Sequence, residues 1–278
     1  MDQLLLEQEK VIRLGFFFGI FTLLALWELA APRRVLVVPK IRRWIANLGL
    51  VVLNTILLRL LFPTAAVGFA LSGEEIGWGL LNNSGLNPWL AVVLGVVALD
   101  FAIYIQHVLF HAIPGFWRLH RMHHADLDYD ITTGARFHPM EIVLSMGIKL
   151  AVVMVMGVPA VAVLIFEVLL NATAMFNHGN IRIPEDIDRI LRLFVVTPDM
   201  HRVHHSIHAP LTNSNFGFNL PWWDRLMGTY VAQPPDGHIK MEIGLDGFRD
   251  PKLVNTIPGM LRLPFIRYLG EYSINRRW

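Results

Sequence analysis

Histidines at helical spacing are the residues of this sequence most suited to chemistry. His107 and His111 form an H-x-x-x-H motif, and two H-x-x-H-H motifs follow at residues 120–124 and 201–205. Because positions i, i+3 and i+4 of a helix share one face, each motif is expected to present its imidazoles together. Neutral imidazole is a common ligand for iron, zinc, copper and nickel. The three motifs supply more rings than one metal ion coordinates, so they predict two metal ions.

The remaining histidines stand outside these motifs. His178, in an N-H-G-N segment, is expected to be a further ligand, because the chain returns there to the side of the motifs. His138 directly precedes Pro139, which is also the place of a helix N-cap, and we expect capping rather than ligation. His208 and His238 are interpreted as ordinary polar residues.

Several classes of site are excluded by residue type. The chain has no cysteine, which excludes disulfides, thiolate metal sites and cysteine nucleophiles. The H-x-x-x-H motif lacks the glutamate of an H-E-x-x-H zinc protease, and no E-x-x-H occurs, so a carboxylate-rich di-iron bundle is not supported. A hydrolase lacks a candidate nucleophile. The alternative to an enzyme is a membrane metal-binding or metal-transport protein, which would place ionisable residues along its spanning helices rather than at one end.

The composition is that of a membrane protein. Of 278 residues, 54% are hydrophobic and 17% charged, and the mean hydropathy is +0.47. The net charge of +2 gives no sign of nucleic-acid binding. The long apolar segments are 14–31, 45–71, 88–108, 142–156 and 160–176. We expect an all-α, polytopic integral membrane protein with about four to five membrane helices and a histidine-rich helical cap. The first segment also fits a signal-peptide core, but it lacks a basic n-region, so a retained helix is favoured.

The charged residues predict the topology. Residues 32–43 carry five basic side chains and no acid, so this loop and the histidine cap are expected on the cytoplasmic side of a bacterial inner membrane or its equivalent. Arg59, near mid-membrane, should face protein, because a lone charge there is costly. Lys149 and Glu167 each lie nine residues from Val158 and should face each other across a helical hairpin.

Two carboxylates are candidates to orient the ligands. Asp100 lies two helical turns before His107, and a carboxylate there can accept the second N–H of a ligating ring. The alternative for Asp100 is an ion pair with Arg59 or Lys149. Asp199 opens the helix of the last motif and is the second candidate.

Two further segments are expected at the membrane surface. Ile187, Ile190, Leu191 and Phe194 follow the i, i+3, i+4, i+7 spacing of an amphipathic helix. Such a helix lies either on the membrane or against the protein's own cap. Residues 276–278, Arg-Arg-Trp, are expected to act as an interfacial anchor.

The order of these motifs resembles a known family. The run D-F-x-x-Y-x-x-H-x-x-x-H, then H-x-x-H-H, N-H-G-N and T-P-D-M-H-R-V-H-H-S, resembles the fatty acid hydroxylase / sterol desaturase superfamily. The later N-S-N-F-G and W-D-R-L-M-G-T-Y segments are similar to the same family. The resemblance covers residues 100–230 of what we expect to be a single domain, 1–278. Its layout is closer to alkylglycerol monooxygenase-like bacterial members than to carotenoid hydroxylases.

This resemblance implies a membrane-bound, non-haem di-iron oxygenase. It implies that O2 and reducing equivalents are used to hydroxylate or desaturate an unactivated C–H bond of a lipid, whether sterol, fatty acyl or alkyl-ether. The implied iron ligands are His107, His111, His120, His123, His124, His201, His204 and His205, with His178 added. No fused ferredoxin or cytochrome b5 segment is visible, so a separate electron donor of that kind is the expected partner.

Overall fold

The computed structural model describes residues 2–267, 270 and 272–274, and within them the fold is helical without a β-strand. The expected anchor at 276–278 lies outside the described residues. Five segments are long and apolar enough to cross a membrane. They are α2 (Glu9–Ala30), α3 with α4 (Lys40–Leu61 and Ala65–Glu75), α5 (Pro88–Ala112), α7 (Pro139–Met156) and α8 (Ala160–Asn177). The predicted all-α, polytopic membrane architecture is confirmed.

Local sequence sets where the spanning helices begin and end. Asn87 caps α5 by accepting a hydrogen bond from the backbone N–H of Trp89, with Pro88 in the first turn. The helix stops at Ala112, two residues before Pro114. Between α7 and α8, Gly157 adopts φ +62°, the left-handed conformation that ends many helices. A hydrogen bond from the Leu81 N–H to the Met156 carbonyl (2.7 Å) packs the loop after α4 onto this turn.

The intramembrane charges fall as predicted in one case and not in the other. Lys149 and Glu167 form the expected pair at 2.6 Å, and Arg13 of α2 joins them at 2.7 Å from Glu167. The prediction for Arg59 was wrong, because its side chain is exposed. Arg59 stands in the last turn of α3, since the apolar segment 45–71 breaks after Leu61. From a helix end, a long arginine side chain can reach the membrane surface.

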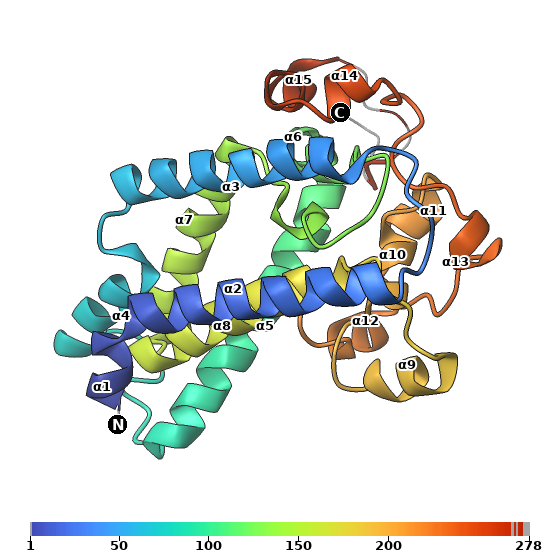
Figure 1. The fold of residues 1–278 in the computed structure, drawn as a ribbon. Coiled ribbons are helices and arrows are strands. Elements are labelled where there is room, and N and C mark those ends of the chain that lie inside the picture. The colour runs from blue at the N-terminus through green and yellow to red at the C-terminus, as the bar shows by residue number, and fades with distance from the viewer. Residues whose placement is uncertain (1, 268–269, 271, 275–278) are drawn as a thin grey trace.

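The short helices form a cap at one end of the spanning bundle. Figure 1 shows α10, α11, α12 and α13 at the right-hand end, opposite the N-terminus and α4. The non-spanning elements are α1 (Asp2–Glu7), α6 (Pro114–His124), η1 (Thr133–Ala135), α9 (Glu185–Leu191), α10 (Pro198–His204), α11 (Ala209–Thr212), α12 (Trp222–Met227), α13 (Gly237–Lys240), α14 (Pro251–Val254), α15 (Ile257–Arg262) and η2 (Leu263–Phe265). All three histidine motifs end in this cap.

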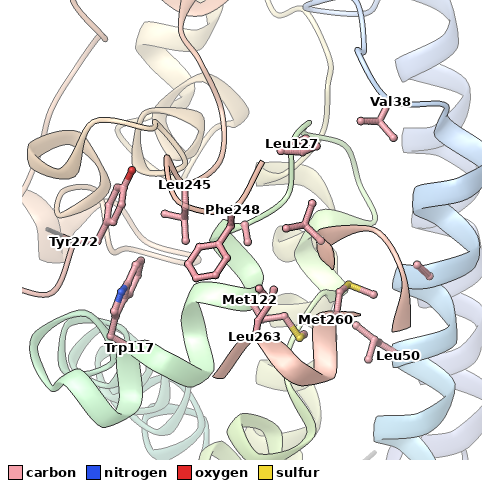
Figure 2. Packing of buried hydrophobic residues seen from close by; sticks show 13 residues of the cluster. Val38, Leu50, Trp117, Met122, Leu127, Leu245, Phe248, Met260, Leu263 and Tyr272 are labelled. Carbon is pink, nitrogen blue, oxygen red and sulfur yellow. The ribbon is translucent and has the colours of Figure 1, made fainter. Parts of the chain in front are cut away.

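An apolar cluster holds α6 in place. Trp117 and Met122 of α6 pack with Phe248, Met260 and Leu263 from the C-terminal segment (Figure 2). Because α6 also carries the second histidine motif, packing of the C-terminal segment against α6 helps to hold that motif in the protein interior.

A buried ionic network holds the loop that follows α6. The guanidinium of Arg43, from α3, pairs with Asp126 at 2.7 Å and with Asp130. Burial alone would raise the pKa of Asp126, but Arg43 and Arg136 lower it to about 2. The carboxylate therefore stays charged and ties the exit of the second histidine motif to α3.

Candidate metal centre

The structure brings all the histidines of the motifs, and His178, into two buried groups. The five-histidine group is His107, His111, His120, His124 and His204. The four-histidine group is His123, His178, His201 and His205. Within each group, one nitrogen of every ring lies within 4.8 Å of the others. The side chains are at most 5% exposed, so both groups are shielded from bulk water.

Each H-x-x-H-H motif contributes to both groups. In the second motif, His120 and His124 join the five-histidine group, whereas His123 joins the other. In the third, His201 and His205 join the four-histidine group and His204 the five-histidine group. Residues one apart differ by about 100° around a helix, so neighbouring histidines point to different sites while i, i+4 pairs stay together. Each motif was expected to present its rings together. The structure corrects this for His123 and His204, which belong to a different group from the other two rings of their motifs.

The separations of the ring nitrogens match metal coordination. His107 Nε2 lies 3.1 Å from His120 Nε2 and 3.0 Å from His204 Nε2. In the four-histidine group, His123 and His178 bring their Nε2 atoms to 3.2 Å. Metal–nitrogen bonds of about 2.1 Å at right angles would place two donors about 3.0 Å apart. Because His107 and His204 both direct Nδ1 to carbonyl oxygens, their facing Nε2 atoms both carry lone pairs, and this spacing favours a shared cation between them.

Four of the five outer nitrogens of the five-histidine group are held by the protein, whereas Nδ1 of His124 has no hydrogen-bond partner among the described residues. His120 Nδ1 lies 2.6 Å from Glu141 Oε1, and His111 Nδ1 lies 3.1 Å from Asn213 Oδ1. His107 and His204 direct Nδ1 to the backbone carbonyls of Phe216 and Ser214, at 2.8 and 2.7 Å. An N–H donated from Nδ1 leaves the Nε2 lone pair free for a metal and fixes the ring orientation.

The four-histidine group is held more loosely. His178 directs Nδ1 to the Ala174 carbonyl at 2.8 Å. Among the residues described, neither Nδ1 of His123 nor either ring nitrogen of His205 has a hydrogen-bond partner. Buried polar atoms are rarely left unpaired, and a metal ion would satisfy one nitrogen of each of these rings.

Burial keeps the cap imidazoles neutral. It lowers the pKa of His120 and of His178 to about 3. For the other cap histidines, burial and then the neighbouring imidazoles lower the pKa well below the usual value; they are His123, His124, His201, His204 and His205. Neutral imidazole is the form that binds metal, so the rings are ready to coordinate at neutral pH.

Comparison with known proteins agrees with this geometry. The family model described as fatty acid hydroxylase matches residues 92–229, a segment that contains both histidine groups. This part of the chain is therefore similar to the fatty acid hydroxylase family. No solved structure matches the chain.

Curated proteins similar to this chain carry names of enzymes that act on lipids. The ornithine lipid hydroxylase OlsE of Rhizobium tropici is 29% identical over 176 residues, which is 63% of this chain and 50% of that protein. The alkylglycerol monooxygenase of Homo sapiens is 29% identical over 150 residues, 52% of this chain and 31% of that protein. The alkylglycerol monooxygenase of Caenorhabditis elegans is 24% identical over 160 residues. The chain therefore spans half or less of the length of these relatives.

The third histidine motif is positioned by a helix cap. The Thr197 hydroxyl accepts a hydrogen bond from the Met200 N–H at the start of α10, and Pro198 follows the cap. His138 also acts as predicted: its Nδ1 accepts from the Met140 N–H as the N-cap of α7. Near His178, a Cβ on Gly134 would meet the Ala174 carbonyl oxygen at 2.4 Å, so only glycine fits there.

The two predicted orienting carboxylates have partners other than histidine ligands. Asp100 accepts hydrogen bonds from the Trp223 indole N–H (2.8 Å) and the Leu220 N–H (3.3 Å), so the expected contact with His107 is corrected. Its alternative partner, Lys149, pairs with Glu167 instead. Asp199 pairs with Arg33 at 3.0 Å and with Arg202, so it joins the cap to the loop after α2.

Sequence reasoning missed Glu141 and Asn213 as partners of the rings. In the sequence, Glu141 is an acid in the first turn of α7, a place that the helix dipole already favours. A usable signal was present, because a helix that starts near the histidine motifs places its first-turn acid at their depth. Asn213 gave no such signal, since it lies in a loop 102 residues from His111.

Proposed function

We propose that this chain is a membrane-bound, non-haem di-iron oxygenase that hydroxylates an unactivated C–H bond of a lipid. The observation that carries the proposal is the pair of adjacent, buried, all-imidazole groups at the end of an apolar helical bundle. The names of the relatives, a lipid hydroxylase and a monooxygenase, support the reaction type. O2 is the co-substrate in this proposal.

The donor set fits two iron ions. Imidazole suits iron, and no thiolate competes because the chain has no cysteine. We assign one ion to each histidine group, and the unpaired nitrogens of His205 support that assignment. When bound, the irons supply the activation of O2 that an organic side chain cannot provide.

Two phenylalanines mark where the substrate carbon would lie. Phe137 stacks on His123, with ring centroids 4.6 Å apart, and lies 6.2 Å from His120. Phe218 lies 6.3 Å from His107 and 6.1 Å from His201. Each phenylalanine thus touches a ring of both groups. Apolar surface at this position excludes water and offers contact to a methylene chain.

The substrate class follows from the relatives and from the membrane setting. Both named lipids, ornithine lipid and alkylglycerol, combine a polar headgroup with an aliphatic chain. We therefore infer hydroxylation of the acyl or alkyl chain of a polar lipid, in preference to sterol desaturation. Electrons come from an external donor of the ferredoxin or cytochrome b5 kind. The basic loop at the cap supports a cytoplasmic site, since such loops stay on that side.

The test compares lipids from cells that express the wild-type chain, His123→Ala and His208→Ala. His208 is an exposed histidine outside both groups, so it is the matched control. We expect a lipid that gains one oxygen atom, derived from isotopically labelled O2, with wild type and His208→Ala only. If the purified wild-type chain holds two irons yet no lipid differs from the His123→Ala sample, the oxygenase proposal is wrong and metal binding without oxygenation replaces it.

A further inference from the structure

An apolar face on the cap is exposed without covering protein among the described residues. It consists of Ile187 and Ile190 of α9, Leu193 and Phe194 after it, and Trp222, Leu226 and Met227 of α12. Phe194 is 65% and Leu226 is 72% exposed. Of the predicted amphipathic set, Leu191 packs inward against the cluster formed with Leu24 and Ile181, whereas the others point outward. Packing of this helix solely on the protein's own cap is thus ruled out.

The exposed residues belong to one structural unit. The indole N–H of Trp222 donates to the Leu193 carbonyl at 2.8 Å. Arg225 donates to the Arg192 carbonyl at 3.1 Å, and Arg192 pairs with Asp188 inside the unit. Two independent hydrogen bonds therefore join α12 to the end of α9, and Figure 1 shows the two helices beside each other.

The unit begins at the level where a spanning helix leaves the bilayer. Arg33 N–H donates to the Asn180 carbonyl, and Arg182 N–H to the Ala31 carbonyl, both at 2.9 Å. These bonds tie the segment before α9 to the cap end of α2. The last turns of α2 expose Leu26 by 60% and Leu29 by 71%. The segment that leads into α9 therefore lies beside the end of a spanning helix whose last turns expose apolar side chains.

We propose that residues 185–194 and α12 form an interfacial foot that inserts its apolar face into the lipid bilayer on the cap side. Arg182, Arg189 and Arg225 are exposed around it, at a level suited to lipid headgroups. An amphipathic surface helix of this kind buries its apolar face about 5–10 Å into the headgroup and acyl boundary. The attachment to the end of α2, a helix long and apolar enough to span the membrane, favours lipid as the occupant over a second protein.

The foot is connected to a histidine of the metal centre. Asp224, on α12, accepts hydrogen bonds from the N–H groups of Phe216 and Gly217, both at 2.8 Å. The Phe216 carbonyl in turn accepts a hydrogen bond from Nδ1 of His107. The foot is thus linked to the five-histidine group through the Asp224 carboxylate and the peptide between Phe216 and Gly217.

The absence of cysteine makes a site-directed spin-label test direct. The full chain is labelled at Phe194→Cys or Leu226→Cys and reconstituted in phosphatidylcholine–phosphatidylglycerol vesicles. Leu29→Cys on α2 is the lipid-exposed reference. Ile239→Cys on α13, where the native side chain is 67% exposed, is the cap reference. We expect the ratio of O2 to water-soluble nickel-chelate collisions at 194 and 226 to exceed that at 239 severalfold and to approach that at 29.

The possible outcomes decide between occupants. Collision ratios at 194 and 226 equal to that at 239 would overturn the foot, and so would dipolar broadening that reports a second copy on this face. If Phe194→Cys or Leu226→Cys elutes as an aggregate, Ile190→Cys on the same face is labelled in its place. The measurement reports lipid contact alone, so it stands or fails independently of the oxygenase proposal.

Discussion

The two histidine groups are alike in chemistry and different in support. In the five-histidine group, four rings direct Nδ1 to protein acceptors, namely a carboxylate, an amide and two backbone carbonyls. In the four-histidine group, His178 directs Nδ1 to a backbone carbonyl and His201 hydrogen-bonds to the Asn215 backbone, whereas Nδ1 of His123 and of His205 has no partner among the described residues. Rings held from behind keep their geometry without metal, whereas free rings adapt to the ion. We infer that the five-histidine site is pre-organised and binds tightly, and that the four-histidine site has more open coordination positions.

Removing one ligand from each group should give the largest difference in metal content between the two sites. His205→Ala leaves three rings at the weaker site, so we expect about one of two metal ions per chain to be lost. His124→Ala leaves four rings at the pre-organised site, and we expect its ion to be retained with weakened affinity. Metal analysis of the purified chains measures both, with His208→Ala as the control. Equal metal loss in the two variants would refute the inequality.

The Glu141 carboxylate should matter to one group only. Glu141→Ala removes the acceptor that holds His120, and we expect affinity at the five-histidine site to fall by about 10–100-fold. Glu141→Gln should lose less, because its amide oxygen can still accept the ring N–H. Competition with a metal-sensitive dye measures the affinity, and Glu185→Ala, at an exposed position, is the matched control. A weakened four-histidine site would show that the two groups are not separately supported.

Metal removal should occur in two phases. Under a chelator, we expect the four-histidine site to release its ion severalfold faster, because fewer of its rings are held in place. The metal remaining on the chain is measured after rapid desalting at successive times. A single phase that accounts for both ions would contradict unequal support.

His238 is a buried histidine outside the two groups, and we expect its effect on stability to be the smallest of those predicted here. Burial lowers its pKa to about 4, although Asp199 opposes this shift. The unfolded chain then binds an extra proton between about pH 6.5 and 4, so stability from this residue is present above pH 6.5 and lost as pH falls toward 4. His238→Gln should therefore lose less thermal stability than wild type across this window. Parallel melting curves for the two proteins would show no such role.

The sequence was informative where the relevant geometry is local. Helical spacing identified eight of the nine histidines of the two groups, and His178 was added because the chain returns to their side. The His138 cap was predicted because capping depends on residues two or three apart. Pairing of Lys149 with Glu167 followed from equal distance to a turn. Arg59 was misplaced, since the end of α3 depends on how the chain breaks before α4.

Tertiary structure alone decided how the histidines divide and what holds them. The partition follows from how α5, α6, α8 and α10 meet, because residues one apart on a helix point about 100° apart. Asn213 and the carbonyls of Ser214 and Phe216 reach rings about 100 positions away or on another helix, and residue type carries no signal for a backbone acceptor. The sequence by itself determined the ligand chemistry and the membrane setting. Long-range packing determined which imidazoles share a site and which of them are held rigid.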